Sequence, residues 1–142
     1  MKTFFKQSLS VAMIIIVTLF AFKTYAGNPA DNPQAQLSLK ISLPQSWQSV
    51  VEKQDFGNEV LFNFKNGNAK PVFLFSITKV SGDQWIALQG QVRGATILEN
   101  KDGYITFLQM TNQSKIKGAD NDLFQQVVEQ LNAVISSIQI NS

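Results

Sequence analysis

Apolar residues recur at every second position in several short segments of this chain, and this periodicity constrains the fold more than any other feature. Residues 37–43 alternate strictly between apolar and polar side chains, which is typical of strands with one buried face, and residues 59–65 again place Val60, Phe62 and Phe64 together on one face. Residues 70–80, KPVFLFSITKV, are rich in β-branched and aromatic side chains on both faces. The first two segments predict half-buried strands, and the third predicts a central strand covered on each side.

Two short turn sequences connect strands into hairpins. Asn66-Gly67 follows segment 59–65, and Asp102-Gly103 lies between the predicted strands 95–98 and 104–110. Such pairs favour tight turns because both residues tolerate positive φ angles. A more polar strand is also expected over 48–55. The strands are therefore expected to pair antiparallel.

The C-terminal segment carries the helical period instead. One apolar stripe recurs every three to four residues and predicts an amphipathic helix across one face of the sheet; its members are Leu123, Phe124, Val127, Val128, Leu131, Val134, Ile135 and Ile138. Asp122, with Gln125 three residues on, resembles a capping box. A short helix is expected after Asp83, ended by Gly90, with Trp85, Ile86 and Leu88 packed inward. The predicted class is α+β, an antiparallel sheet with flanking helices.

The N-terminus reads as a secretory signal peptide. Residues 9–22 form 14 uncharged, mostly apolar positions after Lys2 and Lys6, and small residues at Thr24 and Ala26 predict cleavage between Ala26 and Gly27. The alternative is a permanent membrane anchor, for which this run is shorter than the roughly 20 apolar residues that a spanning helix needs. Cleavage predicts a periplasmic or extracellular protein without a stable membrane anchor.

The remaining 116 residues are expected to form one domain. Residues 27–36 hold two Asn-Pro pairs and predict a disordered lead-in, and residues 37–142 form the single α+β domain. The whole chain has 12 basic and 10 acidic residues. Three lysines (Lys2, Lys6 and Lys23) leave with the signal peptide, so the mature chain has nine basic and ten acidic residues and a net charge of −1. This balance argues against nucleic acid as a partner.

The chain has no cysteine and no histidine. Thiol chemistry, the usual zinc ligand sets and histidine-dependent nucleophile systems are therefore excluded. No cofactor and no metal site are expected.

Three segments resemble the PsbP-like fold. They are ISLPQSW ending at Trp47, LFSITKVSGDQW over 74–85, and DGYITFLQM over 102–110, followed by the amphipathic helix. The chain is similar to a group of small exported bacterial proteins with that fold. The resemblance implies an antiparallel sheet sandwiched by helices and a habit of docking onto other proteins, but no shared chemistry.

Four residues are candidate binding residues. Trp47 and Trp85 lie beside turn sequences, where they either stack a ligand or close the ends of the core. Arg93 is the only arginine of the mature chain and is either a bidentate anion ligand or simply solvated. Tyr104 begins the last predicted strand and completes the set.

Acidic residues offer weaker candidates. Asp83 with Glu99, or Glu52 with Asp55, would have to face one cleft to act as a catalytic carboxylate pair. Residues 120–122, Asp-Asn-Asp, fit a calcium site less well than a helix start, because Leu123 and Phe124 interrupt the ligand spacing. No catalytic residue is assigned.

The leading hypothesis is an exported, non-enzymatic accessory domain that binds another protein. The alternatives are a carboxylate-dependent hydrolase and a small-ligand carrier.

Overall fold

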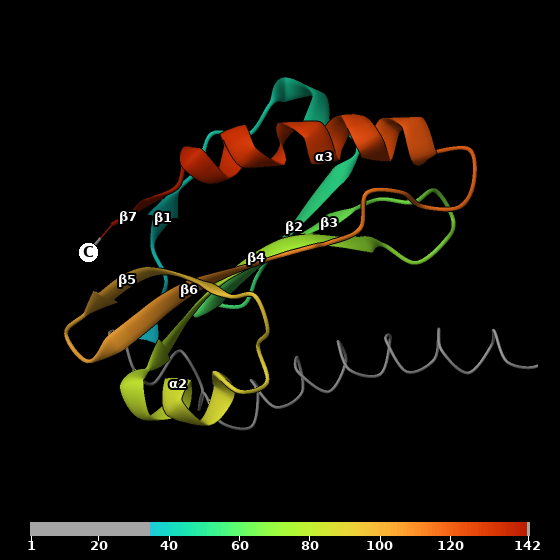
Figure 1. Cartoon of the computed structure of the whole chain (residues 1–142). Helices are drawn as coiled ribbons and strands as arrows, with labels where there is room; N and C mark the ends of the chain where they lie inside the picture. Colours follow the sequence, from blue (N-terminus) through green and yellow to red (C-terminus); the bar gives the residue numbers. More distant parts are fainter. Residues whose placement is uncertain (1–34, 142) are drawn as a thin grey trace, which may run out of the picture.

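The computed structural model describes residues 35–141 (Figure 1). The predicted signal peptide, its cleavage point between Ala26 and Gly27, and all but the last two residues of the predicted lead-in lie outside the described residues. Within them the chain is α+β, as the periodicity predicts.

The sheet has five strands, all antiparallel to their neighbours, in the order β2-β3-β4-β6-β5. The strands are β2 (Val51–Asp55), β3 (Glu59–Phe64), β4 (Val72–Ser81), β5 (Thr96–Lys101) and β6 (Tyr104–Met110). β4 is the middle strand, which confirms the interpretation of its apolar sequence. Asp102 and Gly103 both adopt positive φ, 52° and 81°, so the predicted tight turn between β5 and β6 is also confirmed.

A helix lies on each side of the sheet (Figure 1). The long C-terminal helix α3 (Asn121–Ser136) crosses one side, called here the α3 face, and the short helix α2 (Gly82–Leu88) lies on the other, the α2 face. The two faces have separate apolar clusters, one containing Phe124 and Leu131 of α3 and the other containing Leu88 of α2.

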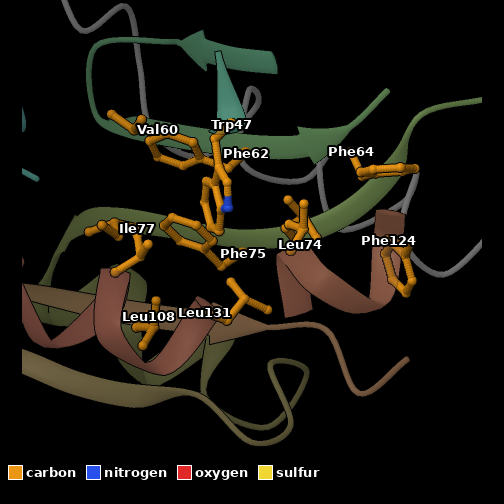
Figure 2. Close-up of a cluster of buried hydrophobic side chains, with 12 residues drawn as sticks. Trp47, Val60, Phe62, Phe64, Leu74, Phe75, Ile77, Leu108, Phe124 and Leu131 are labelled. Carbon is orange, nitrogen blue, oxygen red and sulfur yellow. The ribbon is translucent and has the colours of Figure 1, made fainter. Parts of the chain in front are cut away.

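Aromatic rings dominate the core on the α3 face (Figure 2). Phe62 of β3 stacks on Phe75 of β4 with ring centroids 4.4 Å apart, and Phe64 meets Phe124 of α3 edge-on at 5.3 Å. All four side chains are fully buried. Ring pairs of this geometry add to the free energy gained by burying their area.

A β-bulge in β4 supplies an additional core side chain. Phe62 pairs with Phe75 and Asn63 with Phe73, so Leu74 has no partner on β3. A bulge breaks the alternation of side chains between faces. Leu74 and Phe75 are consecutive, yet both are fully buried in the α3-face core (Figure 2).

The predicted strand 37–43 is largely wrong. Only β1 (Leu39–Lys40) forms, and it pairs with β7 (Gln139–Ile140) at the other end of the chain rather than with the main sheet. Leu37, Leu39 and Ile41 pack on the α3-face core, whereas Leu43 is exposed. The alternation therefore indicates which side chains are buried, although few of the residues pair with another strand. The amide of Asn141 donates to the carbonyl of Ser38 at 2.9 Å, which ties the two ends of the domain together.

The predicted polar strand 48–55 is shorter than expected. A 3-10 helix, Gln45–Trp47, and a turn occupy the preceding residues, and β2 begins at Val51.

Both predicted helix caps lie two residues too late in the chain. Ser81, not Asp83, caps α2, because its hydroxyl accepts from the amide of Gln84 while the Gln84 side chain accepts from the amide of Ser81. The N-cap of α3 is Asp120, which makes no side-chain capping bond, and Asp122 lies inside the first turn. Ile86 is 67% exposed and does not pack inward as predicted.

Candidate functional site

Trp47 belongs to the core. It is 1% exposed and lies among the buried side chains of the α3-face core (Figure 2). Its indole Nε1 donates a 2.7 Å hydrogen bond to Oε1 of Gln130 on α3. A buried indole needs a partner for its N–H group, and Gln130 supplies one. Of the two alternatives for Trp47, ligand stacking or closing the core, the structure places it in the core.

Trp85 lies on the opposite side of the sheet, in α2. It is half-buried, and its ring contacts Phe107 of β6 with centroids 4.9 Å apart. Phe107 also pairs across strands with Ile97 of β5, which is 50% exposed. Trp85 and Ile97 therefore flank the same buried phenylalanine.

Two further exposed residues lie next to members of the apolar cluster on the α2 face in the sequence. Ile86 follows Trp85 and is 67% exposed, and Arg93 is exposed in the loop from α2 to β5. Its neighbour Val92 is buried in the cluster that includes Phe107, which places the Arg93 backbone at the edge of that cluster. We call Trp85, Ile86, Arg93 and Ile97 the α2 surface.

Tyr104 does not join this surface. It starts β6, and the ammonium group of Lys79 lies 5.2 Å from its ring centroid, a cation–π arrangement. Tyr104 pairs with Ser81 of β4, and Thr106, two residues further along β6, pairs with Lys79. Because alternate residues of a strand share a face, the side chains of Tyr104 and Lys79 both project on the α3 face. The structure thus brings Trp85 and Arg93 to one side of the sheet and leaves Trp47 and Tyr104 on the other.

The fold keeps the proposed carboxylate pairs apart. Glu52 and Asp55 are three positions apart in one strand, so they project on opposite faces. Asp83 lies in α2, whereas Glu99 is paired with Thr106 on the α3 face.

The Asp-Asn-Asp sequence 120–122 forms the start of a helix. The side-chain oxygen Oδ1 of Asn121 accepts a 2.9 Å hydrogen bond from the amide of Ile116, which fixes the preceding loop. Among residues 35–141 there is no cluster of three or more acidic, cysteine or histidine residues that could hold a metal ion.

Among residues 35–141 one acidic residue is buried, and it is not one of the candidates that the sequence offers. Glu59 begins β3, is 8% exposed and projects on the α2 face, directly across from Thr78 of β4. Burial raises its pKa to about 7, and the Thr78 hydroxyl partly offsets that rise.

The Thr78 hydroxyl is itself poorly satisfied. Thr78 is 0% exposed, and within the described part of the chain its Oγ1 makes no hydrogen bond of standard geometry. The contact with Glu59 that affects the carboxyl pKa is therefore a loose one, because a full hydrogen bond requires closer or better-aligned atoms.

Glu59 and the α2 surface belong to one line across the sheet. Glu59 pairs with Thr78, Thr78 with Phe107, and Phe107 with Ile97, on the same face. Trp85 lies over Phe107. The only hint of this in the sequence is that Glu59 sits two positions from Leu61 in an alternating strand.

Comparisons of the chain with protein-family models, with characterised proteins and with solved structures find no match. None of the helices in residues 35–141 has the length and apolar character needed to cross a membrane.

Proposed function

We propose that this protein is an exported accessory domain that binds another protein through the α2 surface, without catalysing a reaction. One observation carries the proposal: the two most exposed of the large apolar side chains among the described residues are Ile86, which follows Trp85 in α2, and Ile97, which pairs with the phenylalanine that the Trp85 ring contacts. Grouped exposed apolar side chains favour protein contact, whereas isolated ones need no explanation.

The chemistry of the surface defines the partner it suits. Trp85 offers a partly exposed aromatic ring, and aromatic residues and arginine dominate the free energy of many protein interfaces. Arg93 can bind a carboxylate through two parallel hydrogen bonds. The partner expected is therefore a protein segment with apolar side chains and a nearby Asp or Glu.

Export and the fold family are part of the same proposal. The apolar run 9–22, followed by Thr24 and Ala26, supports export. An antiparallel sheet with a helix on each side and a long C-terminal helix agrees with the PsbP-like resemblance, which would place this domain among docking proteins. For the two alternatives, a hydrolase and a ligand carrier, the described part of the chain offers no comparable group of residues.

Site-specific photocrosslinking in the exporting cell tests the docking surface. A benzophenone amino acid replaces Ile86 or Ile97, and the control replaces the equally accessible Asn132 on α3. The expected result is one crosslinked protein from both α2-surface positions and none from Asn132. The same adduct should fall at least tenfold when Arg93→Glu is combined with either crosslinker position.

Two results would contradict the proposal. An adduct from Asn132 as strong as that from Ile86 would place the partner elsewhere, and an adduct insensitive to Arg93→Glu would remove the electrostatic part of the recognition. Circular dichroism of each variant confirms that the fold is retained.

A further inference from the structure

The cross-strand line on the α2 face connects a titratable group to the α2 surface. Glu59, Thr78, Phe107 and Ile97 are consecutive cross-strand neighbours. Directly paired side chains in antiparallel strands have Cβ atoms about 5 Å apart, so a shift of one side chain changes the packing of the side chain opposite. Thr78 and Phe107 are both 0% exposed, and side chains in a close-packed interior move together with their neighbours.

The Glu59–Thr78 pair has two hydrogen-bonding arrangements. A neutral Glu59 carboxyl can donate its proton to Thr78 Oγ1, whereas an ionised carboxylate can only accept from the hydroxyl. Thr78 Oγ1 has no standard hydrogen bond within the described residues, so it is available to take either role. Ionisation also favours movement of the carboxylate toward water, away from the apolar side chains around it.

Among the described residues, most charged groups of the neighbouring strands project on the face opposite to Glu59, and Arg93 is exposed in the loop after α2. Lys79 of β4 and Glu99 and Lys101 of β5 project on the α3 face. In β2, Lys53 and Asp55 pair with Phe62 and Val60, also on the α3 face. Glu52 shares the α2 face but pairs with Asn63, four positions along β3 from Glu59. Asp83 is exposed in the first turn of α2.

We propose that the protonation of Glu59 sets how Phe107 and Trp85 pack, so that the α2 surface has a protonated form and an ionised form. The significance of this switch for binding rests on the proposed function, but the switch itself is a property of the domain alone. Because Trp85 lies directly over Phe107, its ring reports the change.

The carboxyl titrates in an accessible range. Burial raises the pKa of Glu59 to about 7. Both forms are therefore populated between about pH 6 and 8, where one pH unit on either side of the pKa changes the ratio of the forms tenfold.

Fluorine NMR of the mature chain, labelled with 5-fluorotryptophan, tests the switch without any partner. The two tryptophans give two resonances, and Trp85→Phe identifies which belongs to Trp85. The expected result is that the Trp85 resonance moves with a midpoint near pH 7, while the resonance of Trp47, in the other core, stays fixed. Glu59→Gln should abolish the movement, and Glu52→Gln, on the same face, should preserve it.

A second variant covers the case in which Glu59→Gln does not fold. Thr78→Val keeps the size of the side chain at position 78 and leaves the Glu59 carboxyl in place. It removes only the hydroxyl that lowers the pKa of Glu59. The midpoint of the Trp85 resonance should then move to higher pH.

A Trp85 resonance that does not titrate, that titrates equally in Glu59→Gln, or that keeps its midpoint in Thr78→Val would overturn the proposal. None of these outcomes bears on the crosslinking test, so the switch and the docking surface can fail separately.

Discussion

At the scale of single residues, Glu59 places a carboxyl group where burial opposes its charge. Its pKa is about 7 in the folded chain against 4.5 for an exposed glutamate. The folded chain thus binds the proton more tightly than the unfolded chain between these values. The stability contributed by this group is complete below pH 4.5 and is lost as the pH rises toward 7.

This linkage predicts the effect of Glu59→Gln. The difference between the two pKa values corresponds to about 3 kcal/mol, as an upper estimate. Wild-type protein should lose a substantial part of that free energy of unfolding between pH 4.5 and 7.5, and Glu59→Gln should show a flatter profile and be the more stable protein at pH 8. Urea unfolding over this range measures both, with Glu129→Gln, an exposed glutamate, as control. Parallel profiles for wild type and Glu59→Gln would contradict the assignment.

Trp47 joins the loop before β2 to α3 through a buried hydrogen bond. Trp47→Phe removes the indole N–H that Gln130 accepts and leaves unfilled volume in the core. A loss of about 2 kcal/mol in the free energy of unfolding is expected. Trp85→Phe is the matched control, since Trp85 is only half-buried, and it should cost under about 1 kcal/mol. Equal losses in denaturant titrations would show that Trp47 is not a core residue.

At the scale of elements, α2 is a seven-residue helix whose first turn is fixed by its cap. Helices this short have little intrinsic stability in water, so their ends and packing decide whether they form. Ser81 and Gln84 exchange two hydrogen bonds at the N-terminus, and Leu88 anchors the other end in the core of the α2 face. The position of Trp85 and Ile86 therefore depends on this capping box.

Ser81→Ala should remove the cap. A loss of about 1 kcal/mol in the free energy of unfolding is expected, together with faster amide hydrogen exchange in α2 than in α3. Ser114→Ala, an exposed serine in the loop before α3, provides the comparison and should change neither quantity. If α2 exchanged no faster in Ser81→Ala than in wild type, the capping box would not be what holds the helix.

Strand prediction succeeded where the sheet itself buries the residues and failed where other packing buries them. Strands β3, β4 and β6 and the turn before β6 follow from alternation and from Asp102-Gly103. The segment 37–43 also alternates, but Leu37, Leu39 and Ile41 pack on the α3-face core and only two residues of the segment pair with another strand. Periodicity reports which side is buried and does not identify the element that buries it.

At the scale of the whole molecule, the proposed export signal predicts which chain is present in the native cell. Intact mass measurement of the protein from its native cell should show a mature chain beginning at Gly27. Ala26→Phe should block processing and leave the precursor, because the peptidase requires a small residue at this position. Detection of Met1 on the wild-type protein, located in the cytosol, would reverse the assigned compartment.

The sequence by itself determined the class of the fold, because local periodicity and turn chemistry depend only on neighbours along the chain. It also excluded thiol and imidazole chemistry through the absence of cysteine and histidine. Of the four candidate binding residues, it could not distinguish Trp47 from Trp85, since both follow the same kind of turn sequence.

Only the tertiary structure decided which tryptophan is buried and which faces the α2 side. The tertiary structure alone also shows the β-bulge, which places Leu74 and Phe75 in the same core. It alone shows the pairing of Glu59 with Thr78, which lies 19 positions away in the chain. Cross-strand partners are set by register, and register is a property of the assembled sheet. For that reason the line from Glu59 to Trp85 becomes visible only when the strands are side by side.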